Sequence, residues 1–158
     1  MRKLVSFIII LLFLCLTSLS YAAGSVTQQL SSYDSGRLKI LTFSWTADSS
    51  NAKVPGAVTS VSTTNALQGY YIYMVVTKPG SPAPTSNYDI ILNDQDGMDM
   101  MGGTLANRSA TAVENAVPKV DTTNTLYGGR FVNGNITLLV DGNLVNSAKG
   151  TVKIFLSK

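Results

Sequence analysis

Short runs in which apolar and polar residues alternate recur along most of the chain, and a period of two is typical of β-strands. The run at 25–33 is polar, which favours an edge strand, whereas residues 70–77 are apolar on both faces, which favours a central strand. The apolar positions of residues 37–47 change phase near residues 40 and 41, so we expect a β-bulge there. Further strands are predicted at 57–64, 130–133, 135–141 and 150–156.

The clearest local signal is a β-hairpin between residues 88 and 101. Its turn contains Asp96 followed by Gly97, a pair that supplies the positive φ angle of a tight turn or of its bulge. Apolar residues flank this turn on both sides, as expected for two paired strands. The predicted arms are 88–92 and 98–101, joined by 93–97.

One short helix is expected at 109–117, with Ser109 as its N-cap and Pro118 beyond its end. Residues 78–86 contain three prolines and are expected to form a loop. About eight or nine short strands emerge in all, separated by turn residues. The sequence therefore predicts an all-β fold, a single antiparallel β-sandwich.

The N-terminus has the three parts of a secretory signal peptide. Arg2 and Lys3 precede an apolar run of sixteen residues, and Ser20 and Ala22 form a small-residue cleavage site. We expect cleavage after Ala22, which makes residues 1–22 the signal peptide and 23–158 the β-sandwich domain. The alternative is an uncleaved anchor, but the run is shorter than the roughly 20 residues that span a bilayer. The protein is therefore expected to be exported (periplasmic, extracellular or at the cell surface), with no stable membrane span after cleavage.

Composition excludes several kinds of chemistry. The chain has no His, and its single Cys lies in the segment expected to be removed. The mature domain therefore lacks a Ser-His-Asp or Cys-His nucleophile, a His metal ligand and a thiolate zinc site. Loss of Arg2 and Lys3 leaves 10 basic against 9 acidic side chains, which gives no basic footprint for nucleic acid. We expect a protein that is not an enzyme and does not bind nucleic acid.

Asp94, Asp96 and Asp99 form an oxygen-rich cluster in the predicted hairpin and are the candidate ligands for Ca²⁺. They do not make an EF-hand, because Gly97 stands at the wrong position of the loop. The alternative interpretation is a hairpin turn with solvated carboxylates. Apart from this Ca²⁺ candidate, no cofactor is expected.

Aromatic residues gather in and near the predicted central strand. Tyr71 and Tyr73 share one phase of that strand, and Trp45 lies on a neighbouring predicted strand. Exposed on a sheet face, Trp45, Tyr71 and Tyr73 would form a contact face for sugar rings or a protein partner. The alternative is that they are core and ordinary surface residues.

Five short motifs follow one another in the middle of the chain: T-x-P-G, A-P-T-x-x-Y-D-I, D-x-D-G-x-D, G-G and A-N-R. With them, the segment 69–118 resembles an uncharacterised family of tailed-phage and prophage virion structural proteins, and weaker similarity covers most of 37–156. The resemblance implies a non-enzymatic, self-associating β domain and supplies no catalytic residues. The motifs stand at 77–80, 83–90, 94–99, 102–103 and 106–108.

Two functions follow as expectations. The first is a structural assembly protein, here in an exported form, whose partners are copies of itself or other structural subunits and which is virion-associated if a phage encodes it. Its binding energy would come from an apolar sheet face or a sheet edge. The second is a secreted β-sandwich binding module for glycans or a cell-surface partner. The signal peptide departs from the family's pattern, because phage capsid and tail proteins assemble in the cytoplasm.

Overall fold

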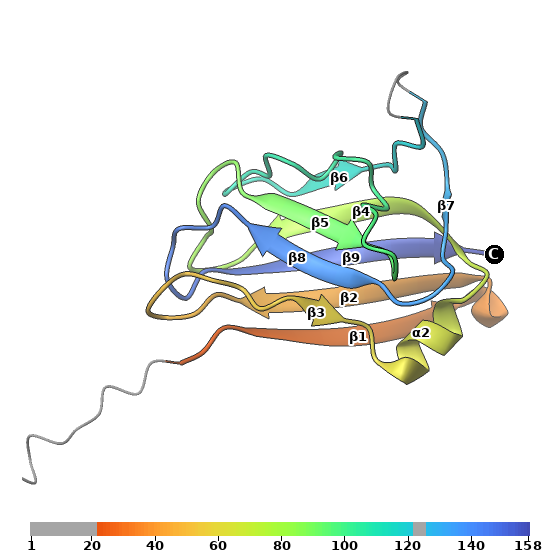
Figure 1. The fold of residues 1–158 in the computed structure, drawn as a ribbon, viewed down its shortest axis with the longest axis horizontal. Helices are drawn as coiled ribbons and strands as arrows, with labels where there is room; N and C mark the ends of the chain where they lie inside the picture. Colours follow the sequence, from red (N-terminus) through yellow and green to blue (C-terminus); the bar gives the residue numbers. More distant parts are fainter. Residues whose placement is uncertain (1–21, 122–125) are drawn as a thin grey trace, which may run out of the picture.

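Two antiparallel β-sheets packed face to face make up the structure, which confirms the all-β prediction and the sandwich architecture (Figure 1). The computed structural model describes residues 22–121 and 126–158. Within those ranges it has nine strands and two short helices. They are β1 (Ser25–Tyr33), η1 (Asp34–Gly36), β2 (Leu38–Thr46), β3 (Ala57–Val58), α2 (Val61–Leu67), β4 (Tyr71–Pro79), β5 (Asp89–Asn93), β6 (Glu114–Ala116), β7 (Arg130–Phe131), β8 (Thr137–Asp141) and β9 (Lys149–Ser157).

The large sheet has the strand order β1-β2-β9-β4-β6, and β7 also pairs with β4; the small sheet has the order β3-β8-β5. β1 lies at an edge of the large sheet, as its polar sequence predicts, and pairs with β2. β4 has β9 on one side and β6 and β7 on the other. This confirms the central position that its two apolar faces predict.

The inward side chains of the two sheets form one hydrophobic core, because alternation along each strand turns every second residue inward. On β9, Val152, Ile154 and Leu156 are fully buried. Trp45 on β2 meets Tyr88 across the core, with ring centroids 5.8 Å apart. Burial of each such side chain contributes about 1.5–3 kcal/mol, so this layer holds the two sheets together.

The predicted strand at 57–64 is wrong beyond its first two residues, because α2 begins at Val61. The hydroxyl oxygen of Ser60 caps this helix and accepts a hydrogen bond from the N–H of Thr63 at 3.3 Å. Near the other end of α2, the ammonium of Lys39 donates to the carbonyl of Ala66. A cation at a helix C-terminus is favourable, so capping and a tertiary contact override the strand preference of the Val/Thr-rich segment.

The predicted helix at 109–117 is also wrong. Ser109 does cap, but its hydroxyl accepts the N–H groups of Thr111 (3.1 Å) and Ala112 (2.9 Å) in a turn. The chain then enters β6, which pairs with β4. The capping pattern is therefore real, but residues 114–116 take their backbone partners from β4 and not from a helix.

The β-bulge expected at residues 40 and 41 does not occur. The register of β2 with both β1 and β9 runs without interruption. Leu38 and Ile40 lie on the outer face of the large sheet, while Leu41 and the residues two and four positions after it lie inside. The apparent change of phase arises because β2 carries apolar residues on both faces. A register shift lies instead between Ile72 and Met74 on β4.

Candidate functional site

The predicted contact face does not include Trp45. This side chain is 2% exposed and belongs to the core. Trp45 is therefore a core residue, as the alternative interpretation expects. Alternation along β2 turns its side chain inward together with those of Leu41 and Phe43. Tyr71 and Tyr73 on β4 are 48% and 38% exposed.

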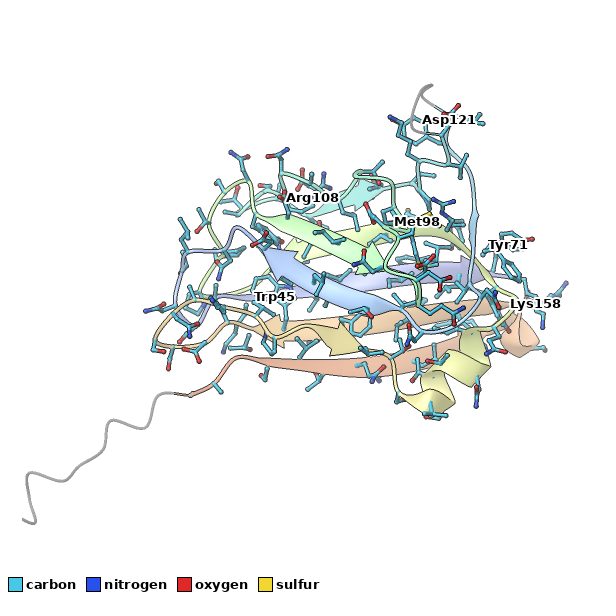
Figure 2. All side chains as sticks on the ribbon, in the orientation of Figure 1. Trp45, Tyr71, Met98, Arg108, Asp121 and Lys158 are labelled. Atoms are coloured by element: carbon cyan, nitrogen blue, oxygen red, sulfur yellow. The ribbon has the colours of Figure 1, made fainter. Side chains whose placement is uncertain are left out.

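Tyr71 and Tyr73 lie in an aromatic patch on the outer face of the large sheet. The Tyr71 ring packs against Phe131 of β7 with centroids 5.3 Å apart, and Tyr73 packs against Phe155 of β9 at 6.1 Å. Ile40, Phe155 and Met74 are successive cross-strand partners beside these rings. The half of the outer face nearest to β7 is therefore apolar, and Figure 2 shows Tyr71 at the margin of the molecule near Lys158.

The three aspartates of the candidate Ca²⁺ site are not gathered around one point. Asp94 accepts the N–H groups of Asp96 and Met98, both at 2.9 Å. Asp99 accepts the N–H groups of Met101 at 3.0 Å and Gly103 at 2.6 Å. Among residues 22–121 and 126–158, no group of three or more His, Cys, Asp or Glu side chains is placed to hold a metal ion. The carboxylates of Asp94 and Asp99 thus accept hydrogen bonds from backbone N–H groups of their own turns.

Three of the four sheet edges are short or covered. β3, at one edge of the small sheet, has two residues, and the far edge of the large sheet is divided between β6 and β7. The other edge of the small sheet, β5, is covered by the segment 99–108. The N–H of Ile90 donates to the carbonyl of Leu105 at 3.0 Å, and that of Met100 donates to Leu92 at 2.7 Å. The second arm of the predicted hairpin is thereby reduced to an isolated bridge between Asn93 and Asp99.

The fourth edge, β1, is long and open; we call it the open edge. It comprises Ser25–Tyr33, with no charged residue, no proline and an unbroken register against β2. Figure 1 shows it along one border of the large sheet. In the part of the chain that the structure describes, no backbone–backbone hydrogen bond joins it to any segment except β2. The N–H of Ser60 donates to the side chain of Gln28 at 3.2 Å and leaves the backbone of β1 unpaired on that side. Proteins usually protect such an edge with charges, prolines, bulges or short strands, and β1 has none of these.

The sequence predicts β1 as an edge strand, but it does not predict that this edge is left unpaired. The polar, uncharged composition of residues 25–33 was the available signal, and it predicted an edge position. Whether another segment covers that edge depends on contacts between residues far apart in the chain, which alternation along one strand does not report.

A second polar cluster links the segment 106–108 to β6. Arg108 Nε lies 3.9 Å from Glu114 Oε2, and Glu114 Oε2 also accepts the N–H of Ser109 at 2.6 Å. Burial of the neighbouring Tyr88, reinforced by the negative charge of Glu114, raises the pKa of its phenol from 10.0 to about 12. At neutral pH this phenol is protonated and its side chain is 1% exposed, so it acts as part of the core.

No protein-family model matches the chain, and a search of curated proteins returns no match. Within the described residues, none of the helices is long and apolar enough to cross a membrane.

Proposed function

We propose that the protein is a non-enzymatic structural subunit, acting in an exported form, that assembles with copies of itself at the open edge. The open edge carries this proposal, because nine consecutive residues present one side of their backbone to no other described segment. The resemblance of residues 69–118 to virion structural proteins of tailed phages supports the same role. The signal peptide predicted at 1–22 supports export.

A second copy fits the open edge better than an apolar peptide does. Strand addition gains affinity from backbone hydrogen bonds and specificity from the side chains that alternate along the added strand. The exposed side chains of β1 include Thr27 and Gln29, and Ser recurs along the strand. Antiparallel pairing of two β1 strands matches hydroxyls and amides with one another, and neither strand brings a charge that repels the other.

The mass of the protein in solution tests this proposal. For the 158-residue chain, we expect static light scattering to give a mass above that of one chain. Replacing Thr27→Lys together with Gln29→Lys places charges on exposed positions of the open edge. We expect this variant to be a single chain at the same concentrations, because like charges across paired strands repel.

The matched control is Gln68→Lys with Thr111→Lys, which adds the same charge at exposed positions away from β1. We expect it to associate like the wild type. A wild type that is a single chain throughout, or a control that dissociates as the β1 variant does, would contradict the proposal. Association that needs Ca²⁺ would instead assign the assembly role to Asp94 and Asp99.

A further inference from the structure

Charge is segregated between the long strands and the rest of the molecule. The four nine-residue strands, β1, β2, β4 and β9, contain no acidic residue. All nine Asp and Glu side chains of the sequence lie outside them. Lys78, Lys149 and Lys153 stand exposed on β4 and β9. One end of the outer face of the large sheet therefore carries positive charge with no carboxylate from its own strands.

These three lysines surround a groove with a volume of about 450 Å³, which we call the basic groove. Thr151 of β9 lies at its centre, with Ser44 of β2 as its partner on one side and Lys78 of β4 on the other. Lys149 and Lys153 stand before and after Thr151 on the same strand. At about 3.3 Å per residue, the two β9 lysines are roughly 13 Å apart along the strand.

One wall of the basic groove is fixed by the loop that follows β4. The N–H of Gly80 donates to the carbonyl of Lys149 at 2.7 Å, and the N–H of Lys149 donates to the carbonyl of Pro82 at 2.9 Å. The two segments approach so closely that a Cβ at Gly80 would lie 2.7 Å from the Cβ of Lys149. This part of the groove is therefore set by backbone pairing.

Trp45 lies beneath the floor of the basic groove, on the core side of the large sheet. Trp45 is one of the groove-lining residues, and a Cβ at Gly150 would lie 2.8 Å from its Nε1. This buried indole N–H has no hydrogen-bond partner within the described structure. Figure 2 labels Trp45 toward the end of the molecule away from Tyr71 and Lys158. Because Gly150 lies directly over the indole, a ligand bound in the basic groove changes the surroundings of Trp45.

We infer that the basic groove binds an acidic polysaccharide. The ammonium groups of Lys78, Lys149 and Lys153 suit its carboxylates or sulfates, because hydrogen bonds between charged partners are the stronger ones. The hydroxyls of Ser44 and Thr151 suit the sugar hydroxyls between them. The span from Lys149 to Lys153 is longer than one pyranose ring, so the groove accommodates more than a single sugar unit.

A nucleic acid fits the same groove less well. Sites for single strands combine a basic groove with aromatic side chains on which bases stack. The single aromatic residue among those that line the basic groove is Trp45, and it is buried. The exposed aromatic patch of Tyr71 and Phe131 lies at the opposite end of the sheet.

Trp45 also supplies the measurement, because it is the only tryptophan of the chain. In a ¹⁵N-labelled sample of the 158-residue chain, the indole N–H gives one cross-peak. Polygalacturonate is expected to shift this cross-peak, and dextran, a neutral polymer, is expected to leave it in place. We expect Lys149→Gln and Lys153→Gln each to weaken binding roughly tenfold, since each removes one charged hydrogen-bond donor.

The matched control is Lys53→Gln, an exposed lysine that does not line the basic groove; its affinity is expected to stay within about twofold of the wild type. The inference is overturned by any of three results: an unmoved indole cross-peak, equal losses in the control, or single-stranded DNA bound as tightly through the same lysines. Variants of Thr27 and Gln29 should bind polygalacturonate normally, which separates this site from the proposed assembly at the open edge.

Discussion

At the scale of single residues, the contact between Gly150 and Trp45 determines how β9 passes over the indole. A Cβ at Gly150 would lie 2.5 Å from the Trp45 ring, which is closer than atoms pack in protein interiors. The absence of a side chain thus allows a large aromatic residue to fill the space beneath the strand. Trp45 then reaches Tyr88 on the opposite side of the core.

Gly150→Ala is expected to lower the free energy of unfolding by about 1–3 kcal/mol, because the added methyl group forces the indole or the strand to move. Urea unfolding followed by the fluorescence of Trp45 measures this. Gly128→Ala is the matched control, since its nearest neighbour would be 3.7 Å away; it is expected to change stability by less than about 0.5 kcal/mol. Equal effects of the two substitutions would contradict this account.

At the scale of elements, the sequence predicted a strand correctly where the residues of that strand alone determine its structure. Alternation located β2, β4 and β9, and polarity placed β1 at an edge. The sequence-based prediction was wrong for α2 and β6. A serine cap accompanies either a helix or a turn, and the contact that decides between them comes from a residue elsewhere in the chain. For α2 that contact is with Lys39, whereas for β6 it is with the backbone of β4.

The turn after β5 shows how an element is held by one carboxylate. Asp99→Asn removes an oxygen that accepts the N–H of Met101 or Gly103, and we expect a loss of about 1–2 kcal/mol in the free energy of unfolding. The control is Asp96→Asn, an exposed neighbour that is expected to change stability by less than about 0.5 kcal/mol. Both are measured by urea unfolding with and without Ca²⁺. A stabilisation by Ca²⁺ that both variants lose would support the cation site instead.

At the scale of the whole molecule, the sequence indicated the fold class but only part of the candidate sites. The aromatic residues were grouped by their spacing along the chain, and the structure separates Trp45 from Tyr71 and Tyr73 by the thickness of a sheet. The basic groove was not predicted, since Lys78 and Lys149 come together only when β4 and β9 pair. The predicted signal peptide lies in residues 1–22, almost all of which are outside the described residues.

Stability above pH 10 depends on Tyr88, which joins the small sheet to the core. Its pKa in the folded protein is about 12, against 10.0 when unperturbed. The folded state therefore keeps a proton that the unfolded state loses, and stability falls as pH rises from 10.0 towards 12. Across this window we expect the wild type to lose roughly 2–3 kcal/mol more than Tyr88→Phe. Urea unfolding in steps of pH measures the difference, and parallel curves for the two proteins would show that Tyr88 does not titrate in this way.

The open edge also fixes how many neighbours strand addition can join. When two β1 strands pair about a two-fold axis, each copy occupies the edge of its partner while its own edge is occupied. The contact therefore has a valence of one, and it stops at a pair instead of growing into a fibre. An extended array of this protein needs a second contact of another kind, so the surface that links the pairs, and not β1, would determine the size and shape of the array.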